Sequence, residues 1–167
     1  LIKDKGAVRK GNQKLAEHNF IDTDDIFPYY SPKPKSKLKE YKDFKLLRTD
    51  NRDLFSPPLL LFKEGTKDGE LCCSYIDYKC AYLSASKGIK CIGKSNAFHK
   101  AAAACLNSSL ATYYFVQISA SIGVDRNRIQ RNEATSFPAI PYILSNESLN
   151  KIAEKVDAII SIYKSTS

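Results

Sequence analysis

The sequence predicts an α+β domain, in which a small antiparallel sheet is followed by packed helices and the chain ends in an amphipathic helix. Three short apolar runs separated by glycine turns lie between residues 59 and 93, and stretches with helical spacing come after them. Strands grouped before helices are typical of α+β folds rather than of doubly wound α/β sheets. The 167 residues suit one domain, or one domain with an appendage, and a hydrophobic fraction of 43% is enough for a core.

The predicted strands are the runs LLLFKEG, ELCCSYIDYKCAYLSAS and IKCIG. The first begins at Leu59 and ends at Gly65, and the segments GTKDG and SKG are the predicted turns between runs. Short apolar runs spaced in this way predict an antiparallel meander or hairpins. Three tyrosines of the second run are interpreted as sheet packing rather than base stacking: Tyr75, Tyr78 and Tyr82.

A helical stretch is predicted from Ser95-Asn96, either of which can cap it, to Gly123. The segment Asn107-Ser108-Ser109 in its middle is expected to bend the helix or to split it into two. Spacings of three and four predict one buried face. That face comprises Ala102, Leu106, Leu110, Tyr113, Tyr114 and Gln117.

The last predicted element is an amphipathic helix from Ser148 to Tyr163, after a connector in which Pro138 and Pro141 exclude a long helix. Its apolar residues follow spacings of 3, 4, 3 and 4, which is the pattern of a heptad seam. Such a seam packs on the body of the domain or docks on a partner. It consists of Leu149, Ile152, Val156, Ile159 and Tyr163.

The charge is strongly basic, with 26 Lys and Arg against 18 acidic residues and a formal net charge of +8. This favours an anionic partner, most often nucleic acid, although a protein that is merely basic has the same balance. Between Lys33 and Arg52, eight basic residues stand against three acidic ones, and the prolines at 28, 32 and 34 favour extended backbone at its start.

Other features exclude some classes of protein. No apolar run is long enough to span a membrane and no signal peptide is seen, so a cytoplasmic location is expected. The five cysteines form no CxxC pair, and small apolar thiols in a reducing compartment are the favoured interpretation. The chain begins with Leu1 and contains no Met, which indicates a piece of a longer protein or a sequence that lacks some residues.

No self-sufficient catalytic site is predicted. The stretch Ser56-Pro57-Pro58-Leu59 matches three places of the catalytic loop of amino-group DNA methyltransferases, but Leu59 has no π-face for a flipped base, so a turn before a strand is favoured. His18 and His99 lack partners at metal-ligand spacing. The acidic cluster at Asp22, Asp24 and Asp25 favours helix entry or loop chemistry over a metal site.

The segment from Leu106 to Pro141 resembles the target-recognition domain of N6-adenine DNA methyltransferases in restriction-modification systems, including TaqI-like carboxy-terminal domains and fused restriction-methylation enzymes. The resemblance lies in the order of LNSSL, of Tyr113-Tyr114, of SIGVDR at 121–126 and of FPAIP at 137–141. Upstream, SPPLLLFKEG resembles a strand of the same family, so the similarity covers roughly residues 55–164.

The resemblance implies a DNA sequence-recognition domain that binds double-stranded DNA for a catalytic methyltransferase domain outside this chain. The parent protein would use S-adenosylmethionine and would be an adenine methyltransferase, possibly fused to an endonuclease, while this chain would bind no cofactor or metal. We expect three parts: a basic, partly irregular segment at 1–54, the recognition core at 55–141 and the terminal helix at 142–167.

The predicted DNA contacts fall in two groups. Lys33, Lys35 and Lys37 alternate in an extended stretch and can follow a phosphate backbone, unless this stretch is only a solvated loop. Arg126, Arg128 and Arg131 can contact guanine or phosphate, unless they pair with Asp125 or Glu133. The alternatives in other classes are a protein-interaction module that uses the seam of the terminal helix, and an endonuclease remnant.

Overall fold

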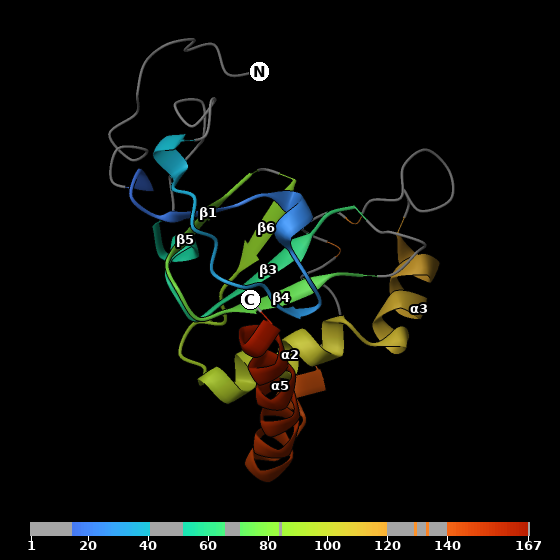
Figure 1. Ribbon diagram of the computed structural model, residues 1–167. Helices are drawn as coiled ribbons and strands as arrows, with labels where there is room; N and C mark the ends of the chain where they lie inside the picture. Colours follow the sequence, from blue (N-terminus) through green and yellow to red (C-terminus); the bar gives the residue numbers. More distant parts are fainter. Residues whose placement is uncertain are drawn as a thin grey trace.

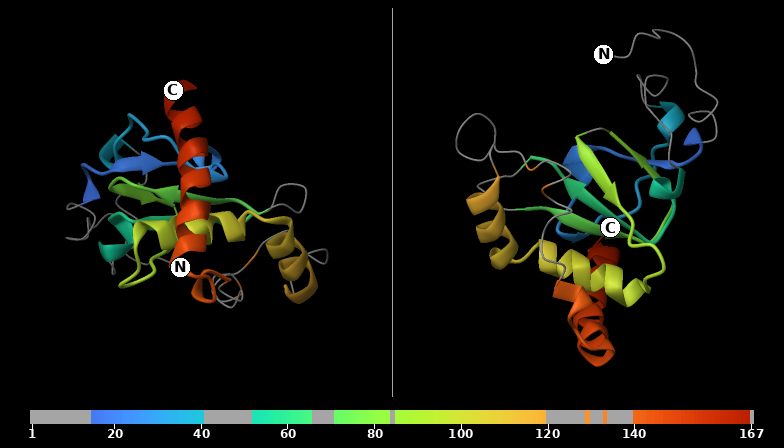
Figure 2. Two further views of the ribbon diagram at one scale, coloured as in Figure 1. Left: turned by 90° about the horizontal axis from the view of Figure 1, so that it is seen from below. Right: turned by 180° about the vertical axis from the view of Figure 1, so that it is seen from behind.

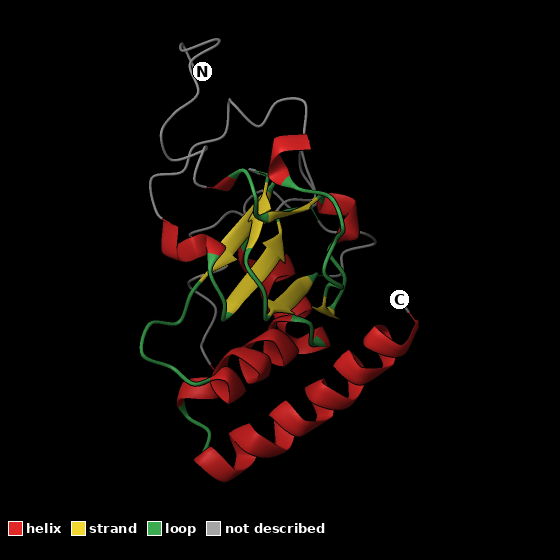
Figure 3. Ribbon diagram, turned by 60° about the vertical axis from the view of Figure 1, so that its left-hand side comes forward, coloured by secondary structure: helices red, strands yellow, loops and turns green. Residues whose placement is uncertain are grey.

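The computed structural model describes residues 15–40, 52–65, 71–83, 85–119, 129, 133 and 140–166. It has the predicted α+β architecture, with a four-stranded sheet, a second sheet of two strands, and two long helices packed against one face of the strands (Figure 1). Figure 3 shows the strands in one layer and the long helices below them.

The larger sheet has the order β2-β4-β3-β6, with β2 at Tyr29–Tyr30, β3 at Leu59–Lys63, β4 at Cys73–Ile76 and β6 at Ser86–Ile89. The strand β3 is antiparallel to both β4 and β6, as predicted, whereas β2 runs parallel to β4. Four successive residues of β3, Leu59 to Phe62, are buried. Since both faces of this strand are covered, its sequence is continuously apolar instead of alternating.

The smaller sheet is a parallel pair of β1, Asn19–Ile21, and β5, Cys80–Tyr82. Neither β1 nor β2 was predicted, because strands of three and two residues are too short for a periodic pattern. The second predicted strand is in fact two, since the chain leaves the larger sheet after Ile76 and joins β1 at Cys80.

The third predicted strand, IKCIG, was placed too late in the sequence. The strand β6 covers Ser86–Ile89, so the predicted turn SKG is its beginning, and Lys90 to Gly93 form a loop. The reason lies at Gly88, where a Cβ atom would stand 1.9 Å from the hydroxyl oxygen of Tyr82. This glycine permits close packing inside a strand and does not mark a turn.

The helical stretch is split, which was one of the two outcomes predicted for Asn107-Ser108-Ser109. The helix α2 covers Asn96–Leu106 and is capped by Ser95, whereas α3 covers Ser109–Ile118 and is capped by Ser108. Each capping hydroxyl accepts a hydrogen bond from the backbone N–H three residues on, at Phe98 and Ala111 respectively. Gly123 lies outside the described residues.

The predicted buried face is wrong for α3. Leu110 and Tyr113 are 57% and 65% exposed, and Gln117 is exposed too, whereas Ala111 and Phe115 are fully buried. The break at residues 107 and 108 changes the phase of the second helix, so a face extrapolated from α2 does not continue onto α3.

The terminal helix α5 covers Asn146–Thr166 and crosses α2, as the two views of Figure 2 show. Its buried residues are Leu149, Ala153, Val156 and Ile160, with Ile152, Ile159 and Tyr163 half-buried beside them. The predicted seam is therefore part of a wider face that packs within the domain. Among the described helices, none is both long and apolar enough to cross a membrane.

Candidate nucleic-acid interface

Hydrogen bonds fix the lysine-bearing segment from Ser31 to Lys37 to β4 and to the connection between β4 and β5. The hydroxyl groups of Ser31 and Ser74 are 2.7 Å apart in the interior, and the buried Tyr78 donates its hydroxyl to the carbonyl oxygens of Ser31 and Pro32 at 3.0 Å. Further along, the side-chain amide of Asn19 donates to the carbonyl of Pro34. The segment is therefore a fixed part of the surface and not a solvated loop without anchors.

The predicted lysines of this segment differ in exposure. Lys33 and Lys35 are exposed, whereas Lys37 is half-buried and its Nζ donates to Oδ1 of Asn19 at 3.4 Å. Within the described ranges, no acidic side chain lies at ion-pair distance from Lys33 or Lys35. Their ammonium groups are thus available to an anion outside this part of the chain.

Two further lysines, which the sequence did not single out, join this surface. Lys79 is exposed and, together with Lys37, lowers the pKa of His18, for which burial is the largest cause. Lys164, from the last turn of α5, lines the same hollow as Lys33. We call the five lysines the basic ridge: Lys33, Lys35, Lys37, Lys79 and Lys164.

The Lys164 hollow has a volume of about 320 Å³ and contains two lysines of the basic ridge. Its lining residues are Tyr30, Pro32, Lys33, Asp77, Tyr78 and Lys164.

Asp77 orients the cation of this hollow. Its carboxylate accepts hydrogen bonds from the Tyr30 hydroxyl at 3.2 Å and from Nζ of Lys164 at 3.1 Å. The hydrogen bond to Asp77 raises the pKa of Lys164, and the ammonium group also lies 5.2 Å from the centroid of the Tyr30 ring. Lys164 is therefore held in place beside Lys33 with its charge balanced by Asp77, so Lys33 supplies the unbalanced positive charge of this hollow.

The sequence could not have indicated Lys164 or Asp77, because they are 87 residues apart and meet only when α5 lies across the sheet. Lys79 follows Tyr78, which anchors the ridge, but nothing in its sequence context distinguishes it from other lysines. The predicted contacts Arg126, Arg128 and Arg131 lie outside the described residues.

The tyrosines of the second predicted strand have structural roles, as predicted. Tyr75 and Tyr78 are buried, and the hydroxyl of Tyr82 donates to the carbonyl of Leu54 at 2.9 Å while its ring stacks on Phe55 at 5.2 Å.

The Ser56-Pro57-Pro58 stretch directly precedes β3, which confirms a turn that leads into a strand. The acidic cluster forms a helix entry, one of the two predicted alternatives, because Asp22 caps the short 3₁₀ helix Thr23–Asp25. No group of three described His, Cys, Asp or Glu side chains could hold a metal ion. The five cysteines are free, and burial raises the pKa of the Cys80 thiol to about 12.

His99 has a structural role at the start of α2. The N–H of Cys91 donates to its Nε2 at 3.2 Å, so the proton of the neutral ring is on Nδ1, which donates to the carbonyl of Ser95 at 2.8 Å. The side chain is 1% exposed, and burial lowers its pKa. Both ring nitrogens are thereby committed to the backbone.

Comparisons with known proteins add no relative: no family model, no curated protein and no solved structure matches this chain.

Proposed function

We propose that the chain is a DNA target-recognition domain, which binds duplex DNA for a catalytic methyltransferase domain outside this sequence. The observation that supports this function best is the basic ridge, because three of its lysines, Lys33, Lys35 and Lys37, alternate along a segment that hydrogen bonds fix to the body of the domain. Alternate residues of an extended segment are about 6.6 Å apart, so successive lysines can contact successive phosphates.

The basic ridge would contribute affinity and position rather than sequence selection. Ammonium groups grip phosphates through charge, and each contact releases counterions, which makes binding salt-dependent. Reading of base edges requires other side chains, for which the proposed contacts remain Arg126, Arg128 and Arg131. The methyl donor S-adenosylmethionine would be bound by the catalytic domain.

The alternative function, a protein-interaction module that uses the seam of the terminal helix, has less support. The seam residues Leu149 and Val156 are already buried, and α5 packs extensively on α2. A partner could reach this face only if the helix left the domain. Otherwise a partner would have to bind the exposed face of α5. Among the large apolar residues described in α5, Ile162 alone is mostly exposed, at 65%.

The experiment that tests the proposed function is a selection from a randomised duplex pool at about 0.15 M salt, followed by sequencing of the retained duplexes. Enrichment of one short motif would support sequence recognition by this chain. Retention without a motif would reduce the proposal to phosphate binding, with selection supplied by the catalytic domain. No retention would reject the proposed function.

A further inference from the structure

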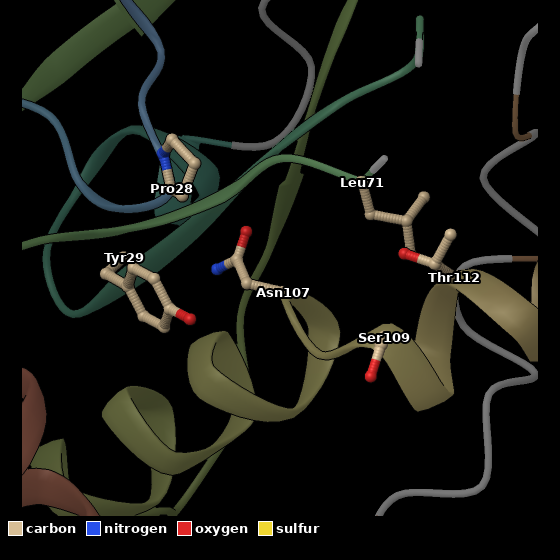
Figure 4. Close-up of a pocket in the computed structure, with 6 residues that line it drawn as sticks. All are labelled: Pro28, Tyr29, Leu71, Asn107, Ser109 and Thr112. Atoms are coloured by element: carbon tan, nitrogen blue, oxygen red, sulfur yellow. The ribbon is translucent and has the colours of Figure 1, made fainter. Parts of the chain in front are cut away.

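A second hollow, of about 390 Å³, lies between the start of β2, the start of β4 and the junction of α2 with α3. In the view of Figure 4, Pro28 and Tyr29 lie on one side, Leu71 and Thr112 on the other, and Asn107 between them. We call it the Tyr29 hollow. None of its described lining residues is charged, in contrast to the Lys164 hollow, so its chemistry suits an uncharged ligand.

Tyr29 has a strained backbone at the edge of this hollow. Its φ is +69°, and the N–H of Tyr30 donates across it to the carbonyl of Pro28 at 2.9 Å. A three-residue turn with a positive φ at its centre has the character of the rare γ-turn, which is unfavourable for any residue with a side chain. Such strain persists only where the surroundings enforce it, and it clusters at ligand sites.

The surroundings of Tyr29 do enforce its conformation. The N–H of Phe27 donates to the hydroxyl of Ser31 at 3.0 Å, and Tyr29 is paired with Ser74 in the register of β2 with β4. The turn is therefore held at both ends, and it places an aromatic ring on the wall of the hollow.

The part of the hollow between its two sides is also fixed in place, because the side chain of Asn107 is fully engaged. Its amide accepts from the N–H of Cys73 and donates to the carbonyls of Cys73 and Ala103. The side-chain polar groups left for a ligand are three hydroxyls, that of Tyr29 and those of Ser109 and Thr112 in the first turn of α3.

The first turn of α3 favours a hydrogen-bond acceptor in the ligand. The cap Ser108 takes the N–H of Ala111, but no described acceptor takes the N–H groups of Ser109 and Leu110. That turn contains no acidic residue either. Backbone N–H groups at a helix start attract partial negative charge, such as that of a carbonyl oxygen.

We propose that the Tyr29 hollow binds one uncharged heteroaromatic ring of nucleobase size that carries a carbonyl oxygen, stacked on the ring of Tyr29. The volume lies within the range of about 300–1,000 Å³ that small-molecule sites have, and one aromatic wall with few polar groups is typical of them. The ring comes either from an extrahelical thymine of a bound duplex, which rests on the proposed function, or from a free nucleoside such as thymidine.

The test compares binding of two probes by the wild-type chain and its variants. One probe is a duplex with a single extrahelical thymine, measured against the same duplex fully paired; the other is thymidine alone, followed by NMR. We expect the wild type to prefer the extrahelical thymine by about 5- to 100-fold, the usual range for stacking of one base on an aromatic ring. Deoxyadenosine, which lacks the carbonyl, should bind more weakly than thymidine.

The variants separate binding from folding. Tyr29→Gly removes the ring and suits a positive φ, so the chain should fold while the preference falls below about 2-fold. Tyr29→Phe keeps the ring and should keep the preference. Thr112→Val, which keeps the shape and removes the hydroxyl, should weaken thymidine binding and leave the affinity for the fully paired duplex unchanged.

Each outcome has a defined meaning. The site is overturned if the preference for the extrahelical thymine survives Tyr29→Gly. It is also overturned if the wild type shows neither that preference nor thymidine binding that depends on Tyr29. Tyr29-dependent thymidine binding without a preference between the duplexes supports the site with a free nucleoside as ligand. The fully paired duplex tests the proposed function alone, so failure of that arm with thymidine binding intact would reject the DNA-binding function and leave the site standing.

Discussion

Asn107 and Cys73, which lie 34 residues apart, are joined by two hydrogen bonds between a side-chain amide and a main-chain peptide group. Oδ1 of Asn107 accepts from the N–H of Cys73 at 2.9 Å, and Nδ2 donates to its carbonyl at 2.6 Å. The strand β2 pairs with β4 only from Ser74 onwards, so it offers no partner to the backbone groups of Cys73. The side-chain amide of Asn107 binds these groups instead. The junction of α2 and α3 is thereby fastened to the sheet.

We therefore expect Asn107→Ala to lower the free energy of unfolding by about 2–4 kcal/mol, because it leaves partly buried backbone groups of Cys73 without their partner. Urea denaturation at neutral pH measures this loss. Asn150→Ala, on the exposed side of α5, is the matched control and should change the free energy of unfolding by less than about 0.5 kcal/mol. Equal effects of the two substitutions would contradict the fastening role.

Gly88 is required by the close approach of Tyr82. A Cβ atom at residue 88 would lie 1.9 Å from the hydroxyl oxygen of Tyr82, which is itself bonded to the carbonyl of Leu54. Gly88→Ala should therefore cost about 1–3 kcal/mol of stability, as overpacking does elsewhere. Gly65→Ala is the control, because nothing lies within 4 Å of a Cβ atom there.

The cause of the Gly88 effect can be checked by a double-mutant cycle. If the clash with Tyr82 is responsible, Gly88→Ala should cost less in a Tyr82→Ala background than in the wild type. The same cost in both backgrounds, measured by urea denaturation, would refute the proposed contact.

Stability should fall on mild acidification because of His99. Burial holds the pKa of the folded imidazole below its ordinary value of 6.5, so the neutral ring is favoured in the folded state. The unfolded chain takes up a proton near pH 6.5 and the folded chain only at lower pH. The contribution of His99 to the free energy of unfolding is therefore fully present above about pH 6.5. It is lost progressively as the pH falls towards the folded pKa, by at most about 1.4 kcal/mol per pH unit.

Urea denaturation between pH 7.5 and 5 measures this dependence, and His99→Gln should reduce it. The pKa of His18 is lowered too, so His18→Gln should remove a separate part of the slope. A slope that neither substitution alters would assign the dependence to other groups.

Much of the fold followed from the sequence, where long apolar patterns decide the structure. The run at Leu59 predicted β3, Ser95-Asn96 predicted the start of α2, and Asn107-Ser108-Ser109 predicted a bend or a split before α3. The two short strands β1 and β2 were missed because their stability comes from pairing with distant partners such as Cys80 and Ser74 rather than from local pattern.

The candidate site was predicted only where it is local in sequence. Lys33, Lys35 and Lys37 were found because they alternate beside prolines, whereas Lys79 and Lys164 reach the same surface through tertiary packing. The positive φ of Tyr29 was also outside the reach of sequence reasoning, since a tyrosine is an uncommon residue in that conformation and no glycine marks the turn.

The basic ridge predicts a specific salt dependence of DNA binding. If Lys33 and Lys35 each contact a phosphate, the plot of log affinity against log salt concentration should lose about 0.9 in slope for each Lys→Gln substitution, and the loss should be similar for all duplex sequences. Titration of a labelled duplex at several salt concentrations measures it. Lys155→Gln, on the exposed side of α5 and outside the basic ridge, is the control of equal charge and should leave the slope nearly unchanged. Equal losses for Lys155 and Lys33 would mean that net charge alone determines the affinity, and the basic ridge would then have no special part in binding.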